Sequence, residues 1–255
     1  MTLVRTTVEA GVGRIHLDDP DHRNVLSPEM SDAIAAAVAV VLADDAGALV
    51  LTASPPVFCA GGSLDSLLAR DQPLATTYAG MQALADAPVP TIAVVDGPAI
   101  GAGCNLPLAC DVILATPLAR FDPRFLDVGI HPGGGHFWRL RQRVGDQGAT
   151  ALVLCGDVLT GAEAAAAGLA WRCLPSDEAE SAALDLARRA AGRSRPLVLR
   201  AKETLRASGL AGSVGEAAAL ELAAQEWSVE QPEFTETVGR LKERLAAKRG
   251  ERDSQ

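Results

Sequence analysis

The chain of 255 residues has no long apolar run and no dense basic cluster. No segment reaches the ~18 uninterrupted apolar residues of a membrane-spanning helix, so we expect no membrane span. The net charge is -9, and no block of Lys and Arg precedes the C-terminal tail, which argues against nucleic acid as a partner. The N-terminal segment 1–10 is charged and alternating, and we therefore expect no signal peptide.

Cysteine and histidine are few and scattered. The five cysteines are odd in number and lack the pairing of metal ligands, a pattern typical of reduced thiols in a cytoplasmic protein. The four histidines are too dispersed to indicate a metal site, and we expect none. These residues are Cys59, Cys104, Cys110, Cys155, Cys173, His16, His22, His131 and His136.

Hydrophobic residues make up 48% of the chain, which is enough for a sizeable core. The length of 255 residues fits one large domain or a domain with an appendage. Strand patterns at 6–18, 48–52, 91–95 and 169–174 alternate with helical patterns, and the chain is helical in pattern from Asp177 onward. The clearest helix start is Ser27-Pro28-Glu29, with a capping hydroxyl and a proline in the first turn. Thr160-Gly-Ala-Glu163 predicts a capping box before a short helix. The order of these elements predicts an α/β core with a helical C-terminal region.

One stretch, residues 96–136, stands out as a candidate binding site. An apolar run ends at Asp96-Gly97, which is typical of a buried strand arriving at a turn. Gly101-Ala102-Gly103 then leaves the backbone almost bare at the start of a short helix expected over 102–109. The first N–H groups of a helix are unpaired and carry a partial positive charge. We expect the polar head of a ligand to bind here.

Several short motifs occur in the order and spacing of one known family. They are Arg23-Asn24-x-Leu26, Phe58-Cys-Ala-Gly-Gly62, the 97–104 loop followed by Cys110-Asp111, Pro132-Gly-Gly-Gly with Arg139-Leu140, the 159–169 segment, and Glu243-Arg244. On these motifs the chain resembles the crotonase superfamily, the enoyl-CoA hydratase/isomerase family, over roughly residues 8–244. The resemblance implies a lyase or isomerase of fatty-acid metabolism.

The resemblance also implies a fold and an assembly. The expected fold is a crotonase-like spiral of ββα units at 1–195, with a helical C-terminal trimerisation region at 196–255. Family members form a homotrimer or a hexamer. The ligand is an acyl-CoA thioester, and no separate cofactor is expected because coenzyme A is part of the substrate.

By motif position, the backbone N–H groups of Gly62 and Ala102 form the family's oxyanion hole. Preorganised donors stabilise the charge that a thioester oxygen gains as an enolate forms. Small residues at Gly61, Gly101 and Gly103 would let the thioester reach the backbone, although the same glycines could instead serve tight turns and close packing. Carried over from the family, the residues that contact coenzyme A are these glycines, Ala60, Arg23 and Lys242, with Arg244, Lys248 and Arg249 as further cations. By pattern alone, Arg23 could instead be a surface arginine, and the C-terminal cations could form a solvated charged helix face.

Two positions depart from the family pattern. Hydratases of the family carry one glutamate directly after the Gly-rich element and a second one in the next segment, as a general acid/base pair. Those positions are Asn105 and Phe125 in this chain. Neither side chain takes up a proton near neutral pH, so we expect negligible hydration by the two-glutamate mechanism. Asn105 could orient a water or the acyl group from the helix face that it shares with Ala102, and Phe125 would fill the pocket.

Three residues could replace the missing carboxylates. Asp127 would point to the same side as Phe125 in extended backbone. His131 and His136 flank the glycine turn, and an imidazole suits proton transfer near neutral pH. Each has an alternative interpretation: a solvated or helix-capping aspartate, and packed or backbone-bonded histidines.

Other functional classes fit less well. Leu106 stands where a dinucleotide-binding motif needs its third glycine, and Asp65 stands where a serine-hydrolase elbow needs its last one. Two alternatives share the expected fold. One is a non-catalytic protein that binds acyl-CoA or fatty acyl groups. The other is an isomerase or thioester hydrolase with a different acid.

Overall fold

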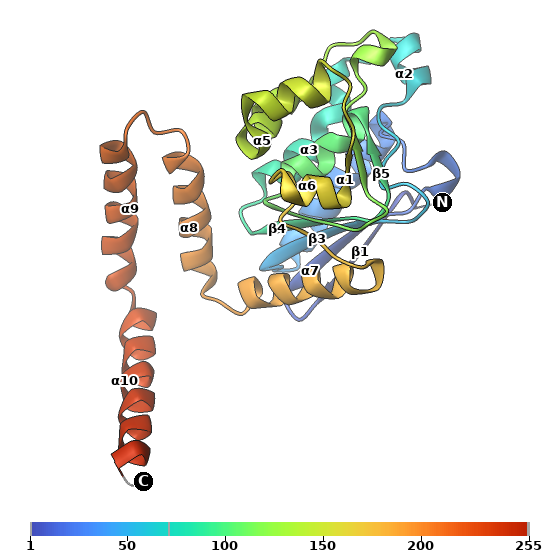
Figure 1. The fold of residues 1–255 in the computed structure, drawn as a ribbon. Coiled ribbons are helices and arrows are strands. Elements are labelled where there is room, and N and C mark those ends of the chain that lie inside the picture. The colour runs from blue at the N-terminus through green and yellow to red at the C-terminus, as the bar shows by residue number, and fades with distance from the viewer. Residues whose placement is uncertain (1, 71, 254–255) are drawn as a thin grey trace. The chain divides into compact units, whose positions relative to one another are not determined.

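The computed structural model describes residues 2–70 and 72–253, with side chains described as far as residue 245. The chain divides after Arg193 into two compact units, residues 1–193 and 194–255. The first unit holds two β-sheets and their covering helices, and the second consists of helices (Figure 1). Within the described residues, no helix is both long and apolar enough to cross a bilayer.

The larger sheet has six strands in the order β1-β2-β3-β4-β6-β9. β1 and β2 form an antiparallel hairpin, and each later pair is parallel. The parallel strands β3 and β4 are apolar and buried almost throughout, which is typical of central parallel strands. The strands are β1 (Val4–Glu9), β2 (Val12–Leu17), β3 (Ala48–Ala53), β4 (Thr91–Val95), β6 (Val112–Ala115) and β9 (Arg172–Cys173).

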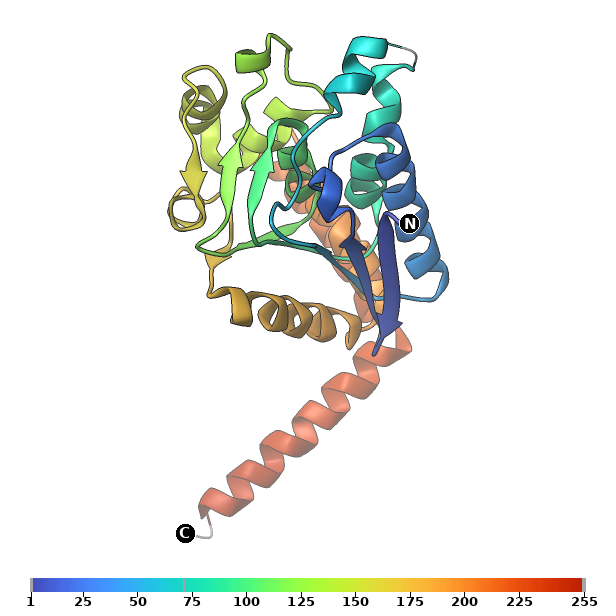
Figure 2. The same ribbon diagram turned by 90° about the vertical axis from the view of Figure 1, so that its right-hand side faces the viewer.

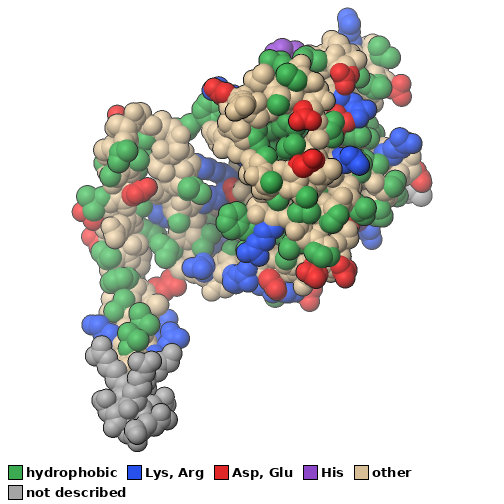
Figure 3. All heavy atoms as spheres, viewed as in Figure 1, with side chains coloured by type: hydrophobic (Ala, Val, Ile, Leu, Met, Phe, Trp, Pro, Cys, Tyr) green, Lys and Arg blue, Asp and Glu red, His purple; other side chains and the backbone are tan. Residues whose placement is uncertain are grey.

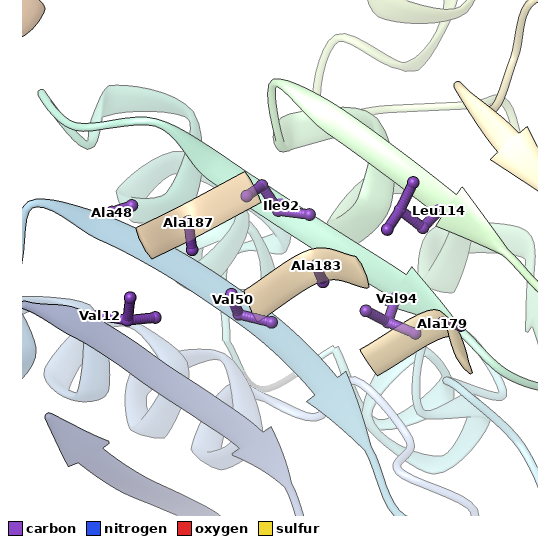
Figure 4. Packing of buried hydrophobic residues seen from close by; sticks show 9 residues of the cluster. All are labelled: Val12, Ala48, Val50, Ile92, Val94, Leu114, Ala179, Ala183 and Ala187. Carbon is purple, nitrogen blue, oxygen red and sulfur yellow. The ribbon is translucent and has the colours of Figure 1, made fainter. Parts of the chain in front are cut away.

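Helices form a layer on each face of this sheet (Figure 2). On one face, α1 (Pro28–Ala43) packs against β1, β2 and the helix α3 (Ala79–Asp86). On the other face, α7 (Ser176–Ala191) lies across β2, β3, β4 and β6. Figure 4 shows Ala179, Ala183 and Ala187 of α7 directed at apolar side chains of the strands. Alanines four residues apart share one helix face, so the helix axis can approach the sheet closely.

The smaller sheet has the order β5-β7-β8 and carries the start of the candidate site. β5 (Pro98–Ile100) pairs in parallel with β7 (Arg120–Asp122), which pairs antiparallel with β8 (Leu159–Thr160). Thr160 then begins α6 (Gly161–Ala166) with a capping box to Glu163, as the sequence predicts.

Local signals predicted several elements correctly. Ser27 caps α1 by accepting a hydrogen bond from Met30 N, and β4 spans the predicted 91–95. The helix expected over 102–109 is instead a 3₁₀ turn, η3 (Gly101–Cys104), followed by α4 (Asn105–Ala109). The strand expected over 169–174 is limited to β9. The short strands β5, β6, β7 and β8 were not predicted from the sequence.

The remaining elements of the first unit are short connections and one long helix. In α5 the chain bends at Gly145, which has φ 69°. These elements are η1 (Pro20–His22), α2 (Leu64–Ala69), η2 (Leu74–Tyr78), η4 (Leu126–Val128) and α5 (His136–Val153).

The second unit consists of α8 (Arg195–Ser208), α9 (Val214–Val229) and α10 (Pro232–Asp253). Arg200 lies 5.1 Å from the ring centroid of Trp227, which links α8 to α9. Figure 3 shows apolar side chains on the surface of these two helices. The large exposed apolar residues of this unit are Leu197, Leu205, Leu210, Val214, Leu220, Leu222, Val229, Phe234, Leu241 and Leu245.

Candidate functional site

Two loops far apart in sequence lie side by side at the edge of the smaller sheet. Cys59 N donates to Pro98 O at 3.2 Å, and Ile100 N donates to Cys59 O at 3.0 Å. Leu26 N in turn donates to Gly61 O at 2.7 Å, and Ser63 N donates to Leu26 O at 3.3 Å. The loop 58–63 is therefore held on one side by the segment around Leu26 and on the other by β5.

Glycine is required where these two loops touch. A Cβ on Gly61 would lie 2.6 Å from Ile100 O, and one on Gly103 would lie 2.4 Å from Cys59 O. Both positions serve close packing of one loop on the other, which the sequence analysis had left as the alternative. Gly62 and Gly101 differ, since a Cβ there would meet nothing closer than 3.8 Å. These two glycines keep the backbone open.

Each loop contains one residue, Gly62 or Ala102, whose backbone N–H group takes no part in the hydrogen bonds between the loops. The bridge to Leu26 uses Gly61 O and Ser63 N, so the Gly62 N–H points to the opposite side of the strand. Ala102 lies in the first turn of η3, where a helical N–H has no acceptor in its own helix. Neither N–H has a hydrogen-bond acceptor among the residues that the structure describes.

A cavity of about 350 Å³ opens beside these N–H groups. Its walls come from the two loops, from α2 and η2, and from the segment 124–131 that follows β7. Ala60, Gly61, Gly62, Gly101 and Ala102 all line it, and so does Phe125, whose ring adds apolar surface as expected. The other apolar side chains in the wall are Leu26, Pro28, Leu64, Leu67, Pro73, Leu74, Ile100, Val128 and Ile130.

The described wall of the cavity contains no Asp or Glu. Its ionisable side chains are Arg23, Tyr78, Arg124 and His131. Asp122 binds the Arg124 guanidinium, with Nε donating to Oδ2 at 2.9 Å, and this bond raises the pKa of Arg124. The described side chains of the cavity wall are therefore cationic or neutral, although the chain as a whole has a net charge of -9.

Behind the cavity, Asn105 and His136 form a buried pair. His136 Nδ1 lies 2.8 Å from Asn105 Oδ1, and Asn105 Nδ2 donates to Gly133 O at 3.2 Å. The amide oxygen is an acceptor, so the His136 proton is on Nδ1. The Phe125 ring meets the His136 ring edge to face at a centroid distance of 4.9 Å. Burial lowers the pKa of His136 to about 4, and its Nε2 has no partner in the described part of the chain.

This pair changes the expectation for both residues. Asn105 and His136 do not line the cavity. The Asn105 amide instead fixes the Gly133 turn and the His136 ring. The motif position of Asn105 predicts that it orients a water or the acyl group, but its side chain is buried and turned into the protein. The alternative of a packed histidine describes His136.

Comparisons with known proteins agree with this geometry. The family model described as enoyl-CoA hydratase/isomerase matches residues 7–251. The chain belongs to the enoyl-CoA hydratase/isomerase family. A relative named probable enoyl-CoA hydratase EchA14, from Mycobacterium tuberculosis, is 40% identical over 242 residues and covers 91% of this chain and 94% of its own length.

Solved structures show the crotonase fold for nearly the whole chain. Enoyl-CoA hydratase subunit I from Geobacillus kaustophilus is 26% identical with a TM-score of 0.87, and the match covers 95% of each chain. Human enoyl-CoA hydratase domain-containing protein 3 is also 26% identical with a TM-score of 0.87, and covers 95% of this chain and 98% of its own. The expected α/β crotonase-like spiral with a helical C-terminal region is thereby confirmed.

Among the substitutes for the family glutamates, the structure brings only one to the described cavity wall. The extended backbone expected after Phe125 is wrong, because Phe125 has φ -58° and ψ -43° and the 3₁₀ helix η4 follows. Asp127 is consequently exposed and does not line the cavity. His131 lines it, and its Nδ1 lies 2.7 Å from Pro132 O. A proton on Nδ1 satisfies that carbonyl and leaves the Nε2 lone pair free to act as a base.

Tyr78 is a cavity residue that the sequence analysis missed. It is the chain's single tyrosine and lies at the end of η2, with its side chain in the cavity wall. A Cβ on Gly133 would lie 2.2 Å from Tyr78 Oη, so the hydroxyl rests against the glycine turn. No motif marks this position, and being the only tyrosine was the one signal available in the sequence.

Residues expected near coenzyme A fall in different places. Arg23 is exposed in the left-handed conformation (φ 56°) at the cavity wall. Lys242 and Arg244 are exposed on α10 in the second unit. The side chains of Lys248 and Arg249 are outside the described residues.

Cys104 is a packed residue. Its Sγ–H donates to Ala99 O at 2.9 Å, and burial raises the pKa of the thiol. Asp111 anchors the turn after α4, accepting from Thr91 N at 2.7 Å.

Proposed function

We propose that this protein binds an acyl-CoA thioester with the thioester oxygen on the N–H groups of Gly62 and Ala102, and that it stabilises the enolate of that thioester. The observation that carries this proposal is that Gly62 and Ala102, whose N–H groups have no acceptor among the described residues, line one cavity from two interlocked loops. Donors that need no reorganisation stabilise developing charge most strongly in a largely apolar cavity.

The same wall argues against ordinary hydration. Addition of water across a conjugated enoyl thioester needs one group to activate the water and one to protonate the α-carbon. Positions 105 and 125 hold an amide and a phenyl ring, and no carboxylate lines the described cavity. We therefore propose α-proton transfer, as in double-bond isomerisation, as the chemistry of this site.

His131 is the base in this proposal. The substrate C–H bond breaks, the proton goes to His131 Nε2, and the electron pair moves into the thioester to place negative charge on the carbonyl oxygen. The hydrogen bond of Nδ1 to Pro132 O holds the imidazole in the tautomer with a free Nε2 lone pair. His131 is exposed, so protons can exchange with solvent at the cavity mouth.

A non-catalytic acyl-CoA or fatty-acyl binding protein is the second candidate. The observation that favours it is the packing of Phe125 on His136, which fills one family acid position with apolar atoms. This candidate keeps the oxyanion contacts and predicts binding without proton exchange.

We also propose contacts to coenzyme A, an assembly of several subunits and a cytoplasmic location. Arg23 at the cavity wall would contact coenzyme A phosphates, and Lys242 would contact them from a neighbouring subunit of a homotrimer or hexamer. The exposed apolar residues of α8, α9 and α10 support such an assembly. Buried free thiols at Cys59 and Cys104 suit the reducing cytoplasm.

A matched pair of ligands tests the oxyanion contact. Isothermal titration calorimetry would compare butyryl-CoA with S-butyl-CoA, a thioether in which a methylene replaces the carbonyl. Two hydrogen bonds to the carbonyl oxygen should make the thioester bind about tenfold more tightly. Equal affinities would show that no oxyanion hole operates, and lack of any binding would reject an acyl-CoA ligand.

An absorbance assay tests the expected lack of hydration. The conjugated enoyl-thioester absorbance of crotonyl-CoA should decrease only negligibly in the presence of the protein. A rapid decrease would contradict the interpretation of positions 105 and 125.

A further inference from the structure

We propose that the Tyr78 hydroxyl is the proton donor of this site, acting on the enolate after His131 has removed a proton. This inference rests on the proposed enolate chemistry and names the acid that the chemistry requires. It assigns to Tyr78 the work of the carboxylate that is missing at position 105.

The position of the hydroxyl is set by the glycine turn. A Cβ on Gly133 would lie 2.2 Å from Tyr78 Oη, and one on Gly134 would lie 2.9 Å from two carbons of the ring. Any larger residue at either place would displace the tyrosine. The ring therefore packs flush on the turn, and its hydroxyl lies next to Gly133.

The same turn connects Tyr78 with Asn105. Gly133 O accepts from Asn105 Nδ2 at 3.2 Å, so the amide and the phenol both meet Gly133. Position 105 is where a family hydratase has a glutamate. Tyr78 thus brings an exchangeable proton close to the place from which that carboxyl group is absent.

Three other hydroxyl groups in the wall donate their protons within the protein. Thr76 Oγ1 donates to Pro73 O at 2.7 Å, and Thr77 Oγ1 donates to Leu74 O at 2.7 Å. Ser66 Oγ donates to Ser63 Oγ, the α2 cap, at 3.0 Å.

The Tyr78 hydroxyl, by contrast, has no hydrogen-bond partner among the described residues. Partial burial raises the pKa of Tyr78, so the phenol carries its proton at neutral pH. A protonated, unpartnered hydroxyl in the cavity wall is available to a ligand.

The step balances in protons and electrons. The electron pair of the enolate C=C bond forms a C–H bond with the Tyr78 proton, the phenol O–H bond breaks, and the thioester carbonyl is restored. A phenolate remains at Tyr78 and an imidazolium at His131. The phenolate takes a proton from solvent and the imidazolium releases one, which returns both groups to their starting states without an added reactant.

Hydrogen–deuterium exchange at the α-carbon tests this role. Butyryl-CoA would be incubated with enzyme in deuterated water, with label uptake followed by mass spectrometry and affinity by calorimetry. We expect Tyr78→Phe to slow exchange by roughly 100-fold while the Kd changes by less than about threefold. The control is Ser176→Ala, which removes an exposed hydroxyl that does not line the cavity and whose proton is already donated to Asp96 Oδ1, and it should exchange at the wild-type rate.

A second measurement needs no variant. Because the chain has one tyrosine, the near-ultraviolet absorbance change on ionisation reports Tyr78 alone. Binding of butyryl-CoA should move the midpoint of this titration, and an unmoved midpoint with ligand bound would contradict contact between the hydroxyl and the acyl group.

The outcomes separate this inference from the proposed function. If wild type and Tyr78→Phe exchange equally fast, the assignment of Tyr78 is wrong and the oxyanion proposal stands. If wild type binds butyryl-CoA without exchange, both proton-transfer roles are rejected and the protein is a binder. If wild type does not bind at all, the proposed function itself fails, and this inference with it.

Discussion

Position 105 carries an amide whose two ends are both occupied within the protein. Its oxygen faces His136 and its nitrogen donates to Gly133 O. A carboxylate here could not donate to that carbonyl, and it would favour the charged form of the buried histidine. The Asn105 amide can therefore accept from a neutral His136 and donate to Gly133 O at the same time. A glutamate at position 105 would lose the bond to Gly133 O and disturb the turn against which Tyr78 packs.

His131 provides the clearest test of proton transfer at a single residue. We expect His131→Gln to slow α-proton exchange in butyryl-CoA by roughly 100-fold with little change in affinity, because it removes the base and leaves the oxyanion donors. Mass spectrometry of label uptake and calorimetry measure the two effects. Asp127→Asn is the matched control, since Asp127 is exposed and does not line the cavity. Exchange that depends on Asp127 instead of His131 would reverse the assignment.

His136 predicts how stability depends on pH. Burial lowers its folded pKa from 6.5 to about 4, so the unfolded chain binds a proton that the folded chain does not. The stabilisation is complete above the unfolded pKa of 6.5 and is lost as the pH falls toward the folded pKa of about 4. His136 should make the free energy of unfolding lower by about 2 kcal/mol at pH near 5 than at pH near 7.5.

Urea unfolding at the two pH values checks this expectation. His136→Gln, which cannot titrate, should lose about 2 kcal/mol of the pH dependence that wild type shows. Equal pH dependence in both proteins would mean that burial does not lower the pKa of His136.

At the scale of elements, the site depends on how closely the 58–63 loop packs against the start of η3. Gly103→Ala would bring a Cβ to 2.4 Å from Cys59 O, and we expect a loss of about 1–3 kcal/mol in stability. Gly62→Ala meets only Leu67, at 3.8 Å, so it should leave stability nearly unchanged while its methyl group enters the cavity and weakens acyl-CoA binding. Chemical denaturation and calorimetry together distinguish the two effects. A stable Gly103→Ala variant with normal affinity would show that the loops tolerate separation.

At the scale of the whole molecule, the helical unit exposes more apolar surface than a solvated unit needs. We expect light scattering to give the mass of three or six copies, because α8, α9 and α10 carry large apolar side chains without cover in the described chain. Leu205 is 71% exposed, and Leu205→Glu should reduce the mass by placing a charge in an apolar interface. Glu203→Gln, on the same helix, serves as the control. A monomeric wild type would remove the assembly from the proposal.

The sequence by itself determined what depends on neighbouring residues. The cap at Ser27, the capping box at Thr160 and the buried strand at 91–95 are local patterns, and each was correctly predicted. The order of short motifs also identified the family, since motif spacing along the chain is itself sequence information. Strands of two to four residues, such as β8 and β6, escaped prediction because so few residues carry no periodicity.

Only the tertiary structure decided which side chains share the cavity. The sequence left the roles of Gly61 and Gly103 open, and contacts with Ile100 O and Cys59 O show that both serve packing between loops. Asp127 does not line the cavity because the backbone after Phe125 is helical, and the pattern of residue types did not specify that conformation. Tyr78 lies in the cavity wall because its ring packs on the glycine turn at Gly133 and Gly134, more than fifty positions later in the chain. Contacts between such distant segments form only when the chain folds, so they leave no local signal in the sequence.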